Sequence, residues 1–511
     1  MADARGRRAV VLGGGFAGLL AARVLSEEFD RVTIVERDPT PSDEYRRGAP
    51  QGRHLHGLLE RGRQILDEFY PGFTEELVDR GAPTTEVLVG SRWYFAGRRA
   101  WPRPTGLTTV LASRPLLETV LRERTMALPG VHLMLGVSAV GLVVEPVAGG
   151  AGRGQARVIG ARVTAGADAP RDGVPGTIEA DIVVDATGWG TRAPHWLAAL
   201  GLAHPPEERF EVDLGYASRL YRREPGHLGG DLSVIMAAVP RTRGGGAIAL
   251  DGDRWHVTLA GMLGDHPPID PAGFEAFSAT LPGPEIHDLI RTAVPLTDPV
   301  PHRFAASARR RYELLPTAPD GFVAFGDALC SLNPLYALGM TVTAQQALAL
   351  RASMAGGAGR AGRVDGLARR FHRRAAAVID IAWTMTTGSD LRYPAVAGRR
   401  DARTRLVNAY VARAQVAAHR DPAVALALVR TVNLIDPPAA LLRPGVIARA
   451  LWRGRGGPAG PGRTGGADAG QPSVSGGSMT TPPIGRNAAG VRSPQPGCRG
   501  PLQRTTTPPQ P

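Results

Sequence analysis

The hydrophobic pattern at the start of the chain predicts a strand, a helix and a second strand. Residues 9–12 form a short apolar run, glycines follow, and apolar residues then recur at helical spacing over 19–25. Residues 31–36 alternate and are rich in β-branched side chains. Such runs are typical of a buried strand, a helix and a half-buried strand. The chain therefore begins as a βαβ unit, which favours an α/β fold with a parallel sheet.

The pattern farther along predicts both kinds of element. Helices are expected at 51–70 and at 115–128, with Ser113 or Arg114 at the entry of the second, and strand-like alternation marks 83–101. After a strand at 322–325, helices are expected again to about Leu451. Further strands are predicted at residues 131–145, 158–163, 178–186, 212–220, 232–239, 247–250, 255–263 and 322–325.

This order of elements predicts an N-terminal Rossmann-like fold interrupted by a mostly β segment. We expect residues 1–205 and 318–350 to form the cofactor-binding domain and 206–317 a β-rich substrate-binding domain. Residues 351–452 are expected to be a helical C-terminal region. Residues 453–511 are dominated by Gly, Pro, Ser and Thr, which cannot supply a core, and are expected to be a disordered tail.

Composition excludes several classes of protein. The net charge is +13 and the sequence contains no lysine, so all 60 basic residues are arginine. No helix-turn-helix, zinc-finger or RRM pattern accompanies this charge, and nucleic-acid binding is not expected. Two cysteines, Cys330 and Cys498, exclude a disulfide framework and a cysteine-based metal site. We find no secretory signal and no membrane-spanning stretch, and expect a cytoplasmic protein.

Residues 10–18 carry the strongest chemical signal, because they fit the G-x-G-x-x-G pattern with a strand before it and a helix after it. Gly13 allows the tight turn, Gly15 lets the backbone approach a pyrophosphate, and Gly18 permits close helix–strand packing. Glu36 ends the second strand, where a carboxylate accepts hydrogen bonds from ribose hydroxyls. The motif predicts a dinucleotide cofactor but does not separate FAD from NAD.

Two later strands end in residues suited to the same cofactor. One ends at Asp185 and runs into a small-residue turn with Gly188, and the other is followed by Gly326 and Asp327. Ligands collect at the carboxyl ends of parallel strands, so Asp327 is expected to accept from a ribityl or ribose hydroxyl. The helix near Gly339–Met340 could aim backbone N–H groups at a flavin ring. An ordinary strand-to-loop aspartate stays open for either segment.

These segments, in this order and spacing, resemble the FAD-dependent monooxygenases of the aromatic-hydroxylase and squalene-epoxidase type. Among them, the chain looks most like the polyketide epoxidases of polyether-antibiotic pathways. The resemblance implies an N-terminal Rossmann-like FAD-binding fold with an inserted mostly β substrate domain and a helical C-terminal part. It covers about residues 8–345 and is carried by residues 35–38, 48–56, 112–117, 185–192 and 326–340.

The resemblance also implies a cofactor site. Arg114 would contact the pyrophosphate or ribityl chain, Asp327 the ribityl chain, and Pro334 with Gly339–Met340 the isoalloxazine. The sequence Tyr-Ala-Leu-Gly-Met over 336–340 departs from the Gly-His-Gly-Met turn that is frequent in the family. The full set of implied FAD-binding residues is Gly13, Gly15, Gly18, Glu36, Arg37, Arg53, Arg114, Asp185, Gly188, Gly326, Asp327, Pro334, Gly339 and Met340.

The activity implied by the resemblance is insertion of one oxygen atom from O2, through a flavin C4a-hydroperoxide, into a large apolar substrate. The reaction would be epoxidation of a polyketide or isoprenoid alkene, or hydroxylation, in secondary metabolism. NADPH or NADH would supply electrons, directly or through a separate flavin reductase. Because the flavin carries the chemistry, no catalytic side chain is expected, and we find no Ser-His-Asp or Cys-His signature.

Several alternatives remain beside this interpretation. A flavin-dependent halogenase relies on a lysine, which this chain lacks. A reductase of isoprenoid double bonds, similar to geranylgeranyl reductases, and a non-catalytic flavoprotein both stay open. The basic, amphipathic stretch 441–453 would either contact a membrane peripherally or pack on the FAD domain.

Two groups of side chains have no assigned role. His54 and His56 have no third ligand at metal spacing, so no metal is expected, and they are expected to pack or to hydrogen-bond near the cofactor. The aromatic residues of 93–101 would line an apolar pocket or form a strand core.

Overall fold

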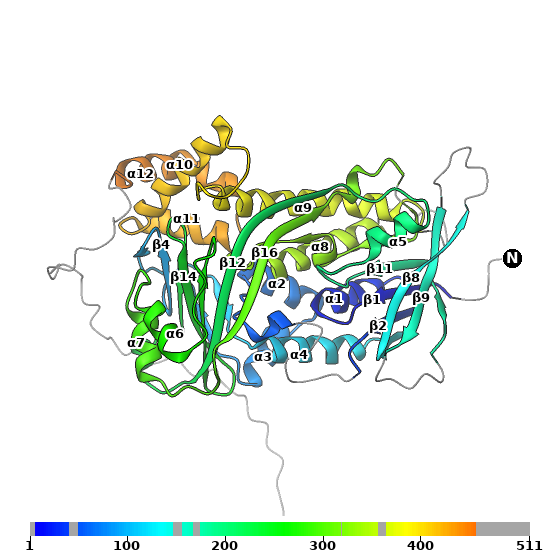
Figure 1. The fold of residues 1–511 in the computed structure, drawn as a ribbon, viewed down its shortest axis with the longest axis horizontal. Helices are drawn as coiled ribbons and strands as arrows, with labels where there is room; N and C mark the ends of the chain where they lie inside the picture. Colours follow the sequence, from blue (N-terminus) through cyan, green and yellow to red (C-terminus); the bar gives the residue numbers. More distant parts are fainter. Residues whose placement is uncertain are drawn as a thin grey trace, which may run out of the picture. The chain divides into compact units, whose positions relative to one another are not determined.

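The computed structural model describes residues 6–39, 50–146, 156–166, 174–317, 319–355 and 364–455. All of them belong to one compact unit. Nearly all of the segment expected to be a disordered tail, and a Gly-x-Gly at 150–152 interpreted as a linker, lie outside the described residues. Figure 1 shows the arrangement of helices and sheets within this unit.

A five-stranded parallel sheet forms the N-terminal part of the unit. Its strand order is β17-β11-β1-β2-β7, and every neighbouring pair is parallel. The βαβ start is confirmed, because helix α1 connects the adjacent strands β1 and β2. The bounds of these elements are β1 (Arg8–Leu12), α1 (Phe16–Leu25), β2 (Arg31–Glu36), β7 (Val131–Leu135), β11 (Ile182–Asp185) and β17 (Phe322–Ala324).

The second large sheet has eight strands, in the order β18-β16-β12-β15-β14-β13-β4-β5. Its neighbouring strands are antiparallel except for β13 and β4. In Figure 1 the long strands β12 and β16 lie side by side and run from this sheet toward the parallel one. Its strands are β4 (Ser91–Phe95), β5 (Arg98–Arg99), β12 (Glu207–Arg222), β13 (Ser233–Met236), β14 (Arg243–Leu250), β15 (Arg254–Gly261), β16 (Val300–Arg310) and β18 (Cys330–Ser331).

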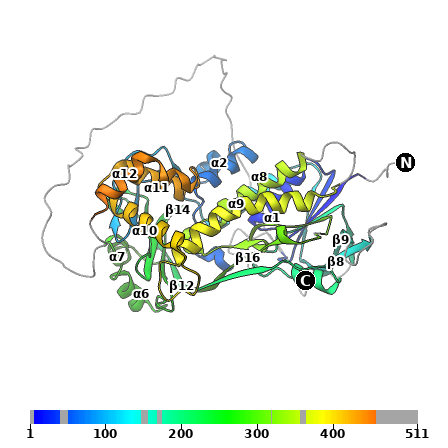
Figure 2. The same cartoon turned by 90° about the horizontal axis from the view of Figure 1, so that it is seen from above.

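Helices cover both sheets, and two small sheets complete the unit. Helices α8 and α9 lie side by side, as Figures 1 and 2 both show, and α8 also contacts α1. The small sheets consist of β3 (Thr84–Glu86) with β6 (Thr108–Val110), and of β8 (Val137–Pro146), β9 (Ala156–Ala165) and β10 (Thr177–Glu179). The remaining α-helices are α2 (Glu60–Phe69), α3 (Phe73–Asp79), α4 (Arg114–Met126), α5 (Ala193–Ala199), α6 (Pro271–Ser278), α7 (Glu285–Thr292), α8 (Gly339–Ala355), α9 (Leu367–Asp390), α10 (Ala402–Ala417), α11 (Pro422–Val432) and α12 (Pro444–Arg453). The 3-10 turns are η1 (Pro50–Arg53), η2 (His227–Gly230), η3 (Tyr312–Leu314), η4 (Gly326–Ala328), η5 (Pro334–Tyr336) and η6 (Pro438–Leu442).

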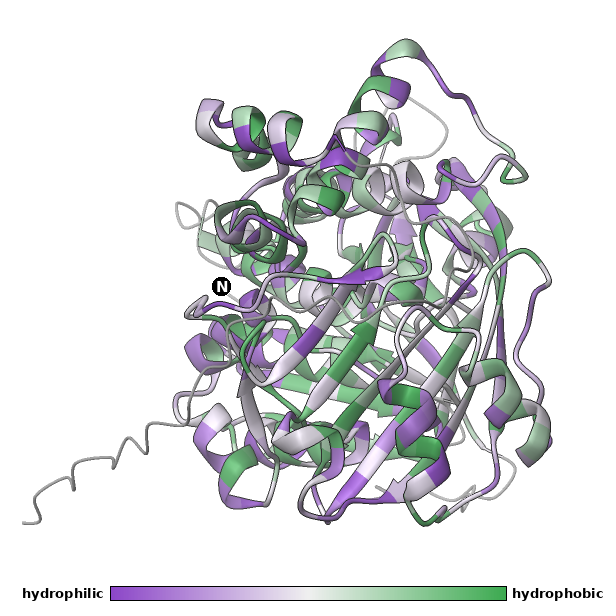
Figure 3. Cartoon of the chain, turned by 90° about the vertical axis from the view of Figure 1, so that its left-hand side faces the viewer, coloured by the Kyte–Doolittle hydropathy of each residue, from purple (hydrophilic) through white to green (hydrophobic). Residues whose placement is uncertain are grey.

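Buried apolar side chains explain why these elements pack as they do. One cluster joins the parallel sheet to α1, α8 and α9, and another joins the larger sheet to α6 and α7. Apolar segments run through the strands at the centre of Figure 3. Burying such surface is worth roughly 25 cal/mol per Å². Among the described residues, no helix has the length and apolar character needed to cross a membrane.

Three predicted elements are wrong in their extent. The strand expected at 178–186 is divided into β10 and β11, which belong to different sheets. Residues 131–145 form two strands instead of one, because Gly136 turns the chain with φ +67° and sends β7 and β8 into different sheets. The helix expected at 51–70 is reduced to η1 and α2. Between them the chain runs against β15, where the Leu55 amide donates to Thr258 Oγ1 at 3.3 Å.

The larger sheet contains strands that the pattern did not assign to it. Strand β16 was not predicted, yet it pairs with β12 along almost its whole length. Strands β4 and β5 fall within the segment expected to belong to the cofactor-binding domain, but they pair with β13 and with each other in the larger sheet. Long-range pairing of this kind leaves no local signal.

We expect replacement of Tyr312 by Phe to leave the free energy of unfolding unchanged or to raise it. Tyr312 is 1% exposed and stacks on His372, and its hydroxyl finds no hydrogen-bond partner within the described part of the chain. Tyr70→Phe is the matched control, because the Tyr70 hydroxyl bonds to Thr125 Oγ1 at 2.8 Å. Its loss should cost about 1 kcal/mol. Urea denaturation midpoints would compare the two, and a larger loss for Tyr312→Phe would contradict this assignment.

Candidate cofactor-binding site

The carboxyl ends of the parallel strands meet at one edge of the sheet. Leu12, at the end of β1, is paired with Val35 on one side and with Asp185 on the other. The amide of Gly13 donates to the Val35 carbonyl at 2.8 Å, and the amide of Phe325 donates to the Asp185 carbonyl at 2.9 Å. The order of strands reverses at β1, and such switch points are where open α/β sheets bind ligands.

The glycine loop after β1 has no room for side chains. Gly13 has φ +99°, and a Cβ there would lie 2.7 Å from the carbonyl oxygen of Ala186. A Cβ on Gly18 would lie 1.8 Å from the carbonyl oxygen of Gly13. The N-cap residue of α1 is Gly15, which has no side chain to accept hydrogen bonds from the first amides of the helix. The start of α1 is therefore open to a negatively charged group such as a pyrophosphate.

Glu36 is buried and holds this loop. Its Oε2 accepts from the amide of Gly14 at 2.8 Å, and its Oε1 accepts from the amide of Asp38 at 2.9 Å. These bonds fix the carboxylate beside the glycine loop, where a ribose is expected. Arg37 and Arg53 are exposed and carry contacts of their own. Contact of these three residues with the adenosine half of FAD stays a prediction.

Arg114 lies beside the start of α1. It begins α4, whose N-cap is Ser113, as the sequence pattern predicted. Its Nε donates to Glu118 Oε1 at 2.7 Å, and its guanidinium lies 5.3 Å from the ring centre of Phe16. Phe16 is the first residue of α1, so Arg114 adds positive charge near the open helix terminus.

Asp327 has the environment of a ligand-binding carboxylate. It lies in η4 after Gly326, whose φ of +65° turns the chain toward Ala17 of α1. Within the described residues the carboxylate of Asp327 makes no hydrogen bond or ion pair. Burial raises its pKa to about 6, and the positive charge of Arg114 partly opposes the shift. An unpartnered carboxylate near a helix terminus fits a hydroxyl-bearing cofactor such as FAD.

Asp185 serves its own turn instead. It is completely buried, and its carboxylate accepts from the amide and hydroxyl of Thr187 at 3.0 and 2.6 Å and from the Thr191 hydroxyl. Burial raises its pKa, and these hydrogen bonds oppose the shift. The turn contains Gly188 with φ +81°. Contact of Asp185 and Gly188 with the cofactor stays a prediction.

The segment predicted to face the isoalloxazine is anchored by an aspartate that the sequence did not reveal. Asp390, at the end of α9, accepts from Asn333 Nδ2 at 3.1 Å and from the Tyr336 hydroxyl at 2.7 Å. Burial raises its pKa to about 6, while both hydrogen bonds lower it. These bonds fix η5, which begins at Pro334. Nothing lies within 4 Å of where a Cβ on Gly339 would stand, so the start of α8 is open.

His54 forms part of a ring cluster, and His56 Nδ1 lies 2.8 Å from the His54 carbonyl oxygen. His54 Nδ1 lies 2.9 Å from Ser218 Oγ, and its ring contacts those of Tyr216 and His302. Of the aromatic residues of 93–101, Trp93 and Phe95 contact each other with ring centres 6.1 Å apart. Tyr94 and Phe95 pack into two different cores, and Trp101 is 40% exposed. These aromatic residues therefore do not line one pocket.

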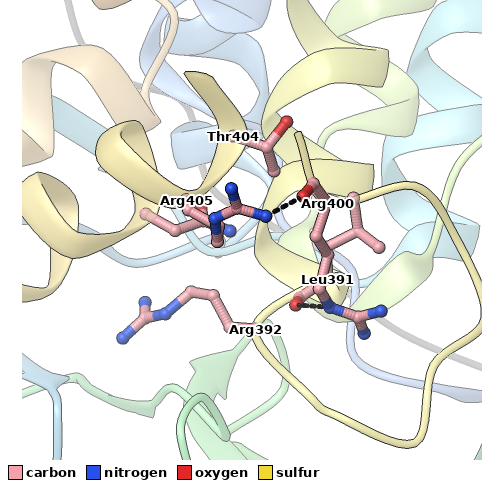
Figure 4. A pocket seen from close by; sticks show the side chains of 6 residues that line it. Leu391, Arg392, Arg400, Thr404 and Arg405 are labelled. Atoms are coloured by element: carbon pink, nitrogen blue, oxygen red, sulfur yellow. Dashed lines mark hydrogen bonds between the residues drawn. The ribbon is translucent and has the colours of Figure 1, made fainter. Parts of the chain in front are cut away.

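A separate hollow of about 290 Å³ lies beside the start of α10 (Figure 4). Arg400 Nε donates to the Leu391 carbonyl at 3.0 Å, and Arg405 Nη1 donates to the Arg400 carbonyl at 2.5 Å. No residue of its lining is among the predicted FAD contacts. The lining residues are Leu391, Arg392, Arg400, Thr404, Arg405 and Asn408.

The parallel sheet with its glycine loop, joined to a larger, mostly antiparallel sheet, is the fold of the FAD-binding monooxygenases. The flavin-dependent brominase Bmp2 shares it with a TM-score of 0.60 at 15% identity, over 87% of this chain and 98% of that one. PqsL, a probable FAD-dependent monooxygenase from Pseudomonas aeruginosa, shares it with a TM-score of 0.53 at 14% identity, over 76% of this chain and 97% of that one. No family model matches the chain.

The chain belongs to the same family as protein Rv3254 of Mycobacterium tuberculosis. The two are 34% identical over 394 residues, which make up 75% of this chain and 80% of the relative. A kynurenine 3-monooxygenase of Salinispora arenicola is 32% identical over 193 residues, 36% of each protein.

We expect Gly18→Ala to weaken both the fold and the retention of FAD. The added Cβ would collide with the Gly13 carbonyl, and overpacking of this kind costs about 1–3 kcal/mol. Gly190→Ala is the control, because its Cβ would meet no atom within 4 Å. Thermal midpoints and the FAD content of the purified proteins would be measured. Equal behaviour of the two variants would show that close packing at Gly18 is unimportant.

Proposed function

We propose that the protein is an FAD-dependent monooxygenase that inserts one atom of O2 into a large apolar substrate. The reaction would be epoxidation of a polyketide or isoprenoid alkene, or hydroxylation. The observation that carries the proposal is the edge of the parallel sheet, where the glycine loop and Asp327 offer an open helix terminus and an unpartnered carboxylate. The kynurenine 3-monooxygenase relative and the PqsL likeness support the choice of monooxygenase.

The residues described above would hold FAD along this edge. The loop from Gly13 to Gly18 and the start of α1 would face the pyrophosphate, with Arg114 beside it. Asp327 would accept a hydrogen bond from a ribityl hydroxyl, and the segment Pro334–Met340 would lie against the isoalloxazine. The bound flavin, once reduced by NADPH or NADH or through a flavin reductase, supplies the activated oxygen.

The chain itself positions the substrate and excludes water. Strands β12 and β15 of the larger sheet face the segment that follows Pro334, as the contact between Leu335 and the core around Tyr216 shows. Apolar side chains such as Val212 and Met262 dominate that core. Apolar surroundings would keep water away from the reacting atoms, which suits an oxygen donor that water would destroy.

Isotope labelling tests the reaction. The purified holoprotein, supplied with NADPH, a flavin reductase and a panel of polyenes, should yield products that are one oxygen atom heavier, with that atom derived from ¹⁸O2. A gain of two hydrogens would instead identify a reductase of isoprenoid double bonds. Incorporation of bromide or chloride would identify a halogenase. A yellow protein that turns over no substrate and consumes no O2 would favour a non-catalytic flavoprotein.

The affinity for FAD should fall as the pH drops below 6. The pKa of Asp327 is about 6 in the free protein, and a hydroxyl that donates to its carboxylate lowers that pKa on binding. The bound state then holds fewer protons, so the dissociation constant should rise by up to about tenfold per pH unit below 6 and stay constant above it. Fluorescence titration with FAD between pH 4.5 and 8 would measure it.

Asp327→Asn should remove this pH dependence. The pKa of Asp390 is also about 6, so Asp390→Asn serves as the control. This variant should keep the rise of the FAD dissociation constant below pH 6. A flat profile in the unaltered protein would contradict the assignment of Asp327 to a cofactor hydroxyl.

A further inference from the structure

Three rings meet where β12 and β16 pass the segment that follows η1. Tyr216 and His302 are paired directly across the two strands, and their ring centres lie 5.1 Å apart. The His54 ring lies 4.6 Å from the Tyr216 ring and 5.3 Å from the His302 ring. His54 and Tyr216 are buried, with 3% and 8% of their surface exposed. We refer to His54, Tyr216 and His302 as the ring cluster.

A chain of hydrogen bonds fixes the tautomer of His54. The Leu55 amide can only donate, and it donates to Thr258 Oγ1 at 3.3 Å. Thr258 Oγ1 lies 2.6 Å from Ser218 Oγ, which is the one acceptor for its proton among the described residues.

Ser218, which faces Thr258 across β12 and β15, then gives its own proton to His54 Nδ1 at 2.9 Å. The ring therefore accepts at Nδ1 and carries its proton on Nε2.

The imidazole of His54 is neutral at pH 7. Burial, followed by the nearby His302 and His256, lowers its pKa to about 3. Burial also lowers the pKa of His302, and it lowers that of His256 to about 4. The ring cluster therefore offers uncharged donors and carries no cation of its own.

Two polar atoms of the ring cluster lack partners. Within the part of the chain that the structure describes, neither Nε2 of His54 nor the hydroxyl of Tyr216 makes a hydrogen bond. Neither atom is among the fully enclosed polar atoms that lack a partner, so both keep some accessible surface. Both side chains are more than nine-tenths buried, yet these donor atoms remain reachable, which points to an acceptor supplied by a ligand.

The ring cluster lies next to the segment predicted to face the flavin ring. Tyr216 belongs to a buried core against which Leu335 packs, and Leu335 follows Pro334 within η5. The hydrogen bonds from Asn333 and Tyr336 to Asp390 hold η5 in place. An acceptor bound by His54 would therefore belong to a molecule lying between the larger sheet and the cofactor.

We propose that His54 and Tyr216 form a subsite that binds the carbonyl oxygen of an uncharged, otherwise apolar substrate. The inference rests on the proposed function and narrows its substrate from any large apolar molecule to one with a carbonyl group near the position to be oxygenated. Nε2–H of His54 donates one hydrogen bond and the Tyr216 hydroxyl a second. A carboxylate fits poorly, because the neutral rings supply no charge to offset its lost hydration.

Three probes of similar shape test the subsite. The holoprotein would be titrated by calorimetry with 2-acetylnaphthalene, 2-ethylnaphthalene and 2-naphthoate. We expect the ketone to bind about tenfold more tightly than the hydrocarbon, as one or two neutral hydrogen bonds allow, and more tightly than the acid. Equal affinity for ketone and hydrocarbon, a preference for the acid, or no binding of the ketone would each overturn the subsite.

Variants assign the preference to the ring cluster. His54→Phe should bring the ketone-to-hydrocarbon ratio close to one without weakening the hydrocarbon, whereas His54→Gln, which keeps a donor, should restore part of it. Ser218→Ala frees Nδ1 and should lower the ratio to an intermediate value. His132→Phe, a change at an exposed histidine of β7, is the control and should leave the ratio unchanged. A full ratio in His54→Phe with normal FAD content would refute the role of His54.

The two proposals fail in different ways. Calorimetry reports the ketone preference whether or not oxygen is transferred. A protein that oxygenates an alkene but shows no ketone preference would lose the subsite and keep the proposed function. A protein that prefers the ketone but gives no labelled product would keep the subsite and lose the monooxygenase assignment.

Discussion

The parallel pairing of β1 with strands on both sides is the constraint on which the rest of the site depends. Because Leu12 faces Val35 and Asp185 at once, three chain segments leave the sheet at the same edge. Their backbones come so close that Gly13 and Gly18 have no space for a Cβ. The first amides of α1 have no side-chain cap at this edge, and together with Arg114 they favour an anion there. The parallel pairing that forms the sheet therefore also brings the predicted cofactor-binding residues together.

Three buried or partly buried aspartates differ in their hydrogen-bond partners, and this difference indicates different roles for them. Asp185 spends both oxygens on its own turn, and Asp390 holds Asn333 and Tyr336. Asp327 alone of the three has no partner among the described residues. Burial raises the pKa of all three, so the shift by itself does not reveal function. The pattern of hydrogen bonds does.

Short sequence patterns predicted the cofactor-binding fold, but they did not predict pairings between strands far apart in the chain. The glycine loop, the start of α4 at Arg114 and the turn at Gly326 could be predicted because each depends on a few neighbouring residues. Strand β16 could not, since its partner β12 lies about ninety residues earlier in the chain. Asp390 resembles any polar residue at a helix end until the fold brings Asn333 beside it. The role of His54 likewise depends on Ser218 and Thr258, which belong to other strands.

The long antiparallel pair formed by β12 and β16 connects the two sheets and is stiff along most of its length. With 16 residues, β12 is about 50 Å long if fully extended. Near one end, Arg310 of its partner strand donates to the carbonyl of Trp189 in the turn after β11, and the ring cluster lies farther along the same ladder. The ladder slips only at a bulge between Glu211 and Leu214. Bending between the turn after β11 and the ring cluster is therefore expected at this bulge, because the hydrogen-bonded pairs on either side of it resist bending.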